Sequence, residues 1–177
     1  MAQCYVAPIT RIPEKDVFLA RVPADTTLQA GAIVDLSELD SAIENNYQVY
    51  VANAPTADSK MLGIVINDGW EQLADGRRPD GQPDYTQYEF KAGDVVCVVA
   101  LEDYIRFEIS TGAIDGTPVV GQFLDMAAGE YQLAPAASAG LLRVEAQKYL
   151  RAGGQFGGSL VGGFIPTVVC MVVHATE

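Results

Sequence analysis

The sequence predicts an all-β protein, β-rich with one short helix, that folds as a single-domain β-barrel or two-sheet sandwich. A seven-residue phrase occurs twice, 62 residues apart, as Leu28–Val34 and Phe90–Val96, with a looser echo at Ile114–Val120. Each phrase sets a glycine, which lets the backbone turn tightly, before a β-branched run that favours a strand. Turn signals recur along the chain, and strands do not alternate with long helices as a doubly wound fold requires.

The individual strands follow from alternating or continuous apolar runs bounded by turn residues. They are expected at residues 17–22, 32–36, 48–52, 61–67, 94–101, 104–109, 119–125, 131–134 and 167–174. The runs at 94–101 and 104–109 are expected to form a hairpin that turns at Glu102 and Asp103. The final run has no polar face until its end, which predicts a central strand covered on both sides. Residues 1–16 are expected as an extended arm, because prolines disfavour helix there.

One short helix is expected between Ser37 and Asn45. Serine is a residue type that caps helix N-termini, and Leu36, Leu39 and Ile43 recur at the spacing of one helix face. Residues 141–150 match a helix and a strand about equally, and the glycine-rich chain beyond them favours the strand, as one arm of a long hairpin.

Two segments are expected as loops of the domain formed by residues 17–177. Residues 68–86 contain Asp-Gly pairs at 75–76 and 80–81 and prolines at 79 and 83, which is the chemistry of turns, so a protruding loop is predicted. Residues 152–163 are rich in glycine but lack the lysine and the following helix of a phosphate-binding loop. They are interpreted as a hairpin tip or an arm that contacts another subunit.

The charge of the chain is unevenly distributed. The net charge is −12, and residues 25–134 hold 5 basic and 19 acidic side chains, a net charge of −14. A region this acidic repels nucleic-acid phosphates, so no direct nucleic-acid binding is expected. Residues 1–24 and 135–177 each hold 3 basic and 2 acidic side chains, so these ends are candidates for contact with another macromolecule. The alternative is that the acidic loops serve solubility alone.

The three cysteines predict neither a disulfide framework nor a zinc site, because their number is odd and their spacing wide. Cys97 and Cys170 lie in valine-rich runs, where a reduced thiol packs as a small apolar group. No secretory signal is recognised, and apolar runs of about ten residues are too short to span a bilayer. We therefore expect synthesis in a reducing cytoplasm and no membrane contact.

No catalytic, metal-binding or cofactor-binding constellation is found. The one histidine, His174, has no nucleophile placed beside it on a strand. The aspartates of loop 68–86 lack the spacing of a calcium loop, and the loop offers one indole, Trp70, for stacking on a sugar. The protein is therefore not expected to be an enzyme. Trp70, Tyr85 and Tyr88 nevertheless define an alternative, a carbohydrate- or receptor-binding β-module of a larger assembly.

The Ala-Gly-x-x-Val strand entries at Leu28–Val34 and Phe90–Val96, with Met61–Val65, resemble phrases of the capsid decoration (cement, or auxiliary head) proteins of tailed bacteriophages. The resemblance implies a β-tulip-like barrel without catalytic activity. It implies binding to the major capsid protein on the outer surface of the assembled head, association of the chain as a homotrimer, and a place on the virion exterior after synthesis in the host bacterium. The residues then expected to contact the capsid are Arg11, Arg143, Lys148, Arg151, Phe156 and Phe164.

Overall fold

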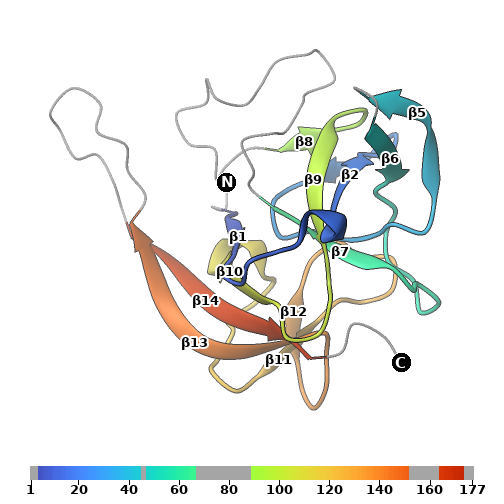
Figure 1. Ribbon diagram of the computed structural model, residues 1–177. Helices are drawn as coiled ribbons and strands as arrows, with labels where there is room; N and C mark the ends of the chain where they lie inside the picture. Colours follow the sequence, from blue (N-terminus) through green and yellow to red (C-terminus); the bar gives the residue numbers. More distant parts are fainter. Residues whose placement is uncertain (1–3, 45–46, 67–88, 152–163, 174–177) are drawn as a thin grey trace, which may run out of the picture.

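The computed structural model describes residues 4–44, 47–66, 89–151 and 164–173, and in them the chain is built almost entirely of strands (Figure 1). The strands are β1 (Val6–Pro8), β2 (Val17–Arg21), β3 (Thr27–Leu28), β4 (Ile33–Asp35), β5 (Leu39–Glu44), β6 (Tyr47–Val51), β7 (Leu62–Val65), β8 (Phe90–Lys91), β9 (Val95–Ala100), β10 (Arg106–Ser110), β11 (Phe123–Asp125), β12 (Ala134–Ala136), β13 (Leu142–Arg151) and β14 (Phe164–Val172). The helical pieces of these ranges are two short 3-10 turns, η1 (Glu14–Asp16) and η4 (Thr111–Ala113). The all-β prediction is confirmed.

The strands form two six-stranded sheets and a small two-stranded one. The first sheet has the order β1-β10-β14-β13-β11-β12 and is antiparallel throughout. The second has the order β4-β7-β9-β2-β6-β5 and contains one parallel pair, β2 with β6. β3 and β8 pair separately, with Leu28 opposite Phe90, so the repeated phrases begin side by side.

Two central strands of the second sheet, β7 and β9, are buried on both faces. Ile64, Cys97 and Val99 of its central strands pack into a cluster with residues of the first sheet, Phe107 and Val168 among them. The alternate residues of the same strands pack on the other face with residues of the small β3–β8 pair: Val65, Val96, Val98, Leu28 and Phe90. Side chains of a strand alternate between faces, so continuous valine runs are required where both faces are covered.

Three glycine turns have the same backbone arrangement. Gly31, Gly93 and Gly121 have positive φ angles of 95°, 88° and 88°, which favour glycine. In each turn the residue after the glycine donates its N–H to the carbonyl three positions before it, at 3.0–3.1 Å.

Each of the three turns is hydrogen-bonded to a buried valine that lies in another strand or directly after one. The glycine donates its N–H to the valine carbonyl, and the valine N–H donates to the carbonyl of the residue after the glycine, all at 2.8–2.9 Å. The pairs are Gly31 with Val65, Gly93 with Val22, and Gly121 with Val144. The third occurrence of the turn-and-strand unit was predicted at the wrong residues. Its turn glycine is Gly121 and its strand is β11, so the unit spans 118–124 and not Ile114–Val120.

The helix predicted between Ser37 and Asn45 is wrong, because Leu39–Glu44 is the strand β5. The edge of β6 supplies hydrogen-bond partners that an isolated segment lacks, and Arg21 of β2 holds Asp40 at 2.6 Å. Ser37 does not cap a helix; its N–H donates to the carboxylate of Asp35 at 2.9 Å. Tertiary pairing has overridden a local periodicity.

The hairpin predicted for 94–101 and 104–109 is also wrong. β9 and β10 lie in different sheets, and the residues between them carry the chain across. Leu101 still donates its N–H to Leu62 beside β9, whereas Tyr104, at a φ of 69°, donates its own to Val172 of β14. The turn residues were recognised correctly, but a turn does not determine which strands pair.

The long hairpin of β13 and β14 is confirmed. Its register runs from Leu142 opposite Val172 to Arg151 opposite Phe164, with a bulge between Val144 and Ala146. β14 lies between β10 and β13, and its residues 167–170 are buried, as predicted for a central strand. Of the residues expected as an N-terminal arm, Val6–Pro8 form β1 and pair with β10. The predicted loops 68–86 and 152–163 and His174 lie outside the described residues.

Candidate functional site: the basic ribbon of β13 and β14

β13 and β14 together form a long curved ribbon that leaves the body of the protein (Figure 1). At its base Leu142 and Val144 of β13 are buried. Beyond the bulge Gln147 and Lys148 are exposed, and the side chain of Tyr149 is 73% exposed. The alternation of buried and exposed side chains therefore ends where the strand passes the edge of the core.

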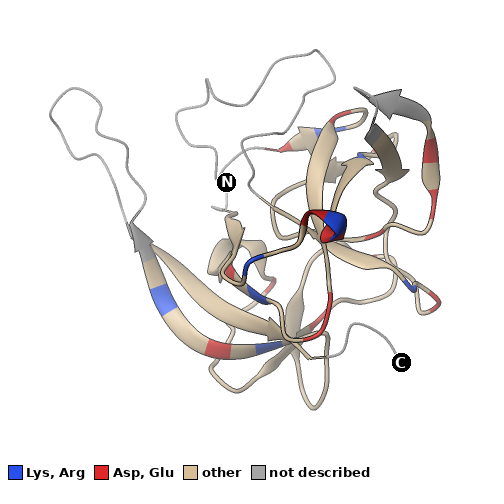
Figure 2. Ribbon diagram, in the orientation of Figure 1, with Lys and Arg blue, Asp and Glu red and all other residues tan. Residues whose placement is uncertain are grey.

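The ribbon concentrates positive charge in an acidic protein. The sequence of β13 contains Arg143, Lys148 and Arg151 and one acidic residue, Glu145. Figure 2 shows the first two basic residues on either side of the acidic one. Glu145 accepts two hydrogen bonds from the guanidinium of Arg106 on β10, at 2.8 and 3.1 Å, a bidentate ion pair. This contact raises the pKa of Arg106, and it leaves the remaining charge of β13 positive.

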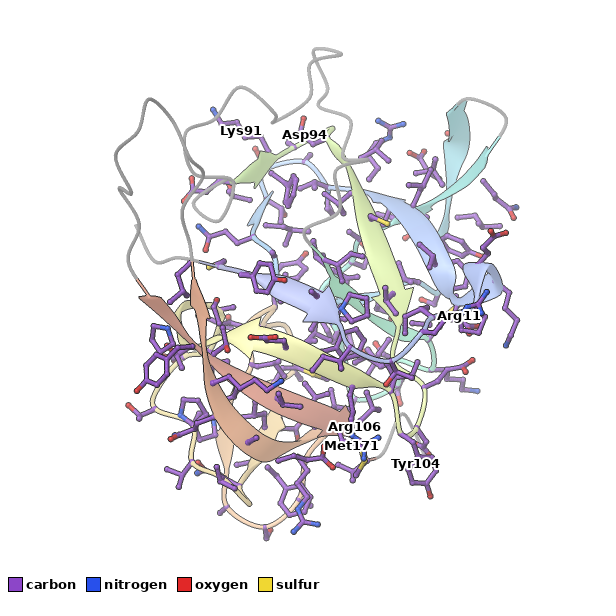
Figure 3. The ribbon with its side chains drawn as sticks, turned by 60° about the vertical axis from the view of Figure 1, so that its left-hand side comes forward. Arg11, Lys91, Asp94, Tyr104, Arg106 and Met171 are labelled. Atoms are coloured by element: carbon purple, nitrogen blue, oxygen red, sulfur yellow. The ribbon has the colours of Figure 1, made fainter. Side chains whose placement is uncertain are left out.

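Strand register places these charges on one face. Arg143 lies opposite Met171 of β14, and Met171 lies opposite Arg106 of β10, so the Arg106–Glu145 pair reaches over the central strand (Figure 3). Lys148 lies opposite Thr167, which has the same facing as Met171 because four positions separate them. Arg143 and Lys148 thus share the face that points away from Phe107 and the core.

Four of the six residues predicted to contact a partner occupy this ribbon. Arg143, Lys148 and Arg151 lie on β13, and Arg151 stands in register with Phe164 of β14. Arg11 lies elsewhere, exposed beside η1 (Figure 3). The other predicted candidates, Phe156 for the partner contact and Trp70, Tyr85 and Tyr88 for ligand stacking, lie outside the described residues.

Sequence reasoning missed an apolar turn beside the ribbon. Val119 and Val120 are 57% and 52% exposed, and Gln147 of β13 donates from Nε2 to the carbonyl of Pro118 at 3.3 Å. Together with the backbone bonds of Val144 to Gly121 and Gln122, this contact places the turn along the edge of β13 that faces away from β14. Two adjacent valines before a turn glycine, where turns are usually polar, were the available signal.

A pocket of about 280 Å³ lies away from the ribbon, because none of its lining residues belongs to β13 or β14. It is lined by Cys4, Thr27, Leu28, Gln29, Ala30, Ala32, Glu89, Ala113, Tyr131 and Gln132. The Cys4 thiol donates to Oε1 of Gln29 at 3.0 Å, and Nε2 of Gln29 donates to Glu89 at 3.3 Å. Burial first, and then the charge of Glu89, raises the pKa of Cys4. The thiol is therefore held protonated, which makes it a poor nucleophile.

Cys97 and Cys170 are buried, as expected of thiols in valine-rich runs. Within the described ranges, no group of three or more His, Cys, Asp or Glu side chains is placed to hold a metal ion. No helix in those ranges has the length and apolarity to cross a bilayer. No family model, curated protein or solved structure matches the chain.

Proposed function

We propose that the protein is a non-enzymatic structural protein of a tailed-phage virion that binds the outer surface of the assembled capsid and bridges its subunits. The observation that supports this most strongly is the basic ribbon, where Arg143 and Lys148 share an outward face on a chain of net charge −12. The proposal also rests on the resemblance of the glycine-turn phrases to those of capsid decoration proteins. The partner is the major capsid protein, the chain acts as an oligomer, with a trimer favoured, and its place is the virion exterior.

The mechanism of stabilisation is mass action. A protein that binds the assembled lattice but not the separate subunits shifts the equilibrium toward the lattice, by about 2.7 kcal/mol per site at a free concentration 100 times the dissociation constant. Such a role needs a stiff scaffold more than a cleft. The three valine-anchored turns, each with its glycine at a positive φ, would provide that stiffness.

Co-sedimentation with purified empty heads tests the proposal. The double variant Arg143→Glu with Lys148→Glu should lose most of the binding, because both changes place negative charge on the proposed contact face. Lys60→Glu with Lys91→Glu is the matched control, since both lysines are exposed and lie outside the ribbon. Equal sedimentation of the ribbon variant and the control would contradict the ribbon as the contact, and absence of binding by the unmodified chain would contradict the function.

The pocket at Cys4 favours a second candidate, a ligand-binding module for a carbohydrate or another small polar molecule. Its lining combines the amides of Gln29 and Gln132 with a carboxylate and a tyrosine, groups that hydrogen-bond to hydroxyls. A glycan array distinguishes the two candidates. Binding of a sugar that is lost in Gln29→Ala and kept in Gln147→Ala would favour the module over the decoration protein.

A further inference from the structure

Each of the two large sheets has one long strand edge that no other described strand pairs with. In the first sheet it is the outer part of β13, and in the second sheet it is β5. β13 pairs with β11 only where Leu142 and Arg143 meet Leu124 and Phe123, so among the described residues 146–151 have a neighbouring strand, β14, on one side. β5 is the last strand of the second sheet and also has six residues. The other end strands are three residues long.

Those shorter end strands are each protected against further pairing. β1 contains Pro8 and β12 contains Pro135, and proline has no N–H to offer a neighbouring strand. The outer side of β4 is already used, since Ile33 donates its N–H to Tyr131 at 2.7 Å. Among the described residues, no proline and no backbone hydrogen bond of this kind protects the outer edge of β5 or that of β13 beyond Gln147.

The backbone of β13 directs hydrogen-bonding groups at its open edge. Thr111 donates from its hydroxyl to the carbonyl of Pro166 at 3.3 Å, so this carbonyl points away from β13. Tyr149 is the residue opposite Pro166. In an antiparallel pair of strands, the N–H and carbonyl groups of two opposite residues either point toward each other and form hydrogen bonds or point away from each other. The N–H and carbonyl of Tyr149 therefore point outward, and alternation gives the same direction to Gln147 and Arg151.

The two edges are complementary in charge. Residues 146–151 contain Lys148 and Arg151 and no acid, whereas residues 38–44 contain Glu38, Asp40 and Glu44 and no base. Asp40 is held by Arg21, and Glu38 accepts a hydrogen bond from Nδ2 of Asn53 at 2.8 Å. With three acids and no base, residues 38–44 keep a net negative charge after the pairing with Arg21.

Each of the two edges also exposes an apolar side chain. Tyr149 of β13 is 73% exposed and Leu39 of β5 is 49% exposed. Pairing of the edges would cover both side chains as well as the open backbone groups of the two strands.

We propose that copies of this chain assemble head to tail, with β5 of one copy adding as a strand to the open edge of β13 in the next. The two edges lie on opposite sides of the molecule (Figure 1), so they meet between chains and not within one. Unlike surfaces that pair in this way close into a ring or continue as a filament. The contact involves copies of this chain alone and depends on the backbone edge of β13, although Lys148 belongs to both this edge and the proposed capsid contact. The mass of the protein without capsids reports the self-assembly alone, so each proposal can fail without the other.

Light scattering coupled to size exclusion tests the contact with two variants at one position. Tyr149→Thr and Tyr149→Pro both remove the aromatic ring, but only proline removes the outward N–H, and neither removes a bond to β14. We expect the unmodified chain to have a multiple of the 18.9 kDa chain mass, Tyr149→Thr to keep the multiple, and Tyr149→Pro to have the mass of one chain. A single-chain mass for the unmodified protein at its highest soluble concentration would overturn the proposal, as would an assembly unchanged by the proline.

A charge exchange provides a test that does not depend on the proline variant folding. Arg151→Glu and Glu44→Lys should each weaken the assembly, because each sets like charges against one another across the contact. The two changes together should restore it, since every contact then again pairs opposite charges. Far-UV circular dichroism confirms that each variant is folded. Folded single variants that assemble normally, or a folded double variant that does not recover, would contradict the pairing of these edges.

Discussion

The backbone N–H of Gly93 lies 2.9 Å from the carbonyl oxygen of Val22, and Val22 donates its own N–H to the carbonyl of Asp94 at the same distance. These two bonds fasten the turn that precedes β9 onto the end of β2. Arg21 adds a third bond, from Nη1 to the carbonyl of Gly93 at 2.9 Å. Because the same reciprocal arrangement recurs at Gly31 and Gly121, the repeated phrase in the sequence is a unit of tertiary structure and not of secondary structure alone.

The turn glycines should differ in their tolerance of a side chain. Gly31 and Gly121 both have positive φ, and an alanine there costs about 1–2 kcal/mol in backbone strain. A Cβ at Gly31 would also lie 2.7 Å from Cβ of Ala113, whereas a Cβ at Gly121 would meet nothing within 4 Å. We expect Gly31→Ala to lower the free energy of unfolding by about 2 kcal/mol more than Gly121→Ala, because overpacking adds to the strain.

Urea unfolding of the two variants measures this difference. Ala113→Gly in the Gly31→Ala background should recover the steric part and leave the backbone part. Equal losses for Gly31→Ala and Gly121→Ala would show that the contact with Ala113 relaxes freely.

The glycine of the Leu62–Val65 phrase serves packing rather than a turn. A Cβ on Gly63 would lie 2.4 Å from Cγ1 of Val98 on the neighbouring β9. We expect Gly63→Ala to lower the unfolding free energy by about 1–3 kcal/mol. Val98→Ala should compensate in part, because the carbonyl oxygen of Val99 would still lie 3.1 Å from the added carbon. A thermal unfolding cycle of the two single variants and the double variant measures this coupling, and strictly additive losses would contradict it.

The two arginine–carboxylate pairs should differ in their contribution to stability. The side chains of Arg21 and Asp40 are 26% and 17% exposed, and those of Arg106 and Glu145 are 42% and 31% exposed. Arg21→Met leaves the charge of Asp40 with little access to water, so we expect a loss of about 2–3 kcal/mol in the free energy of unfolding. Arg106→Met should cost less than about 1 kcal/mol, because water and salt screen the exposed pair.

Chemical unfolding at low and high salt separates the two pairs. The effect of Arg106→Met should shrink as salt rises, and that of Arg21→Met should persist. Adding Asp40→Asn to Arg21→Met should recover part of the loss. A larger cost for the Arg106 variant would contradict this ranking.

The strands were predictable because they depend on local sequence. The valine runs of β9 and β14 indicate strands that are buried on both faces, and the glycine of each repeated phrase indicates a turn. What the sequence did not reveal is which strands pair. The 37–45 segment has helical spacing, yet β6 and the Arg21–Asp40 contact hold it as β5. Pairing over such separations is determined by the whole chain and not by a local window.

For the candidate site, the residues were predictable from the sequence but their contacts were not. The basic residues of β13 were singled out from charge alone, and the hairpin register then places Arg151 opposite Phe164. The bidentate Arg106–Glu145 pair could not be anticipated, because 39 positions separate the two residues and β14 lies between their strands. The pocket at Cys4 was missed for a similar reason, since its lining is drawn from segments distant in the sequence.

Cys170 should make the protein less stable in alkali. Burial first, and the charge of Glu145 second, raises the pKa of Cys170 from an ordinary value of 9.0 to about 12. Between these two values the unfolded chain releases the thiol proton while the folded chain keeps it, so the free energy of unfolding must fall as pH rises through that range. Below pH 9 this contribution is fully present. We expect Cys170→Ala, in a chain that also has Cys4→Ala and Cys97→Ala, to flatten this alkaline slope.

The reactivity of the same thiol provides an independent measurement. In the chain whose only cysteine is Cys170, an aromatic disulfide reagent at pH 8 should react at the rate of global unfolding, because the folded state contains almost no thiolate. Urea should release one reactive thiol per chain. Reaction in the folded state at the rate of a free thiol would show that Cys170 is accessible and ionised, and would contradict both the raised pKa and the buried position of β14.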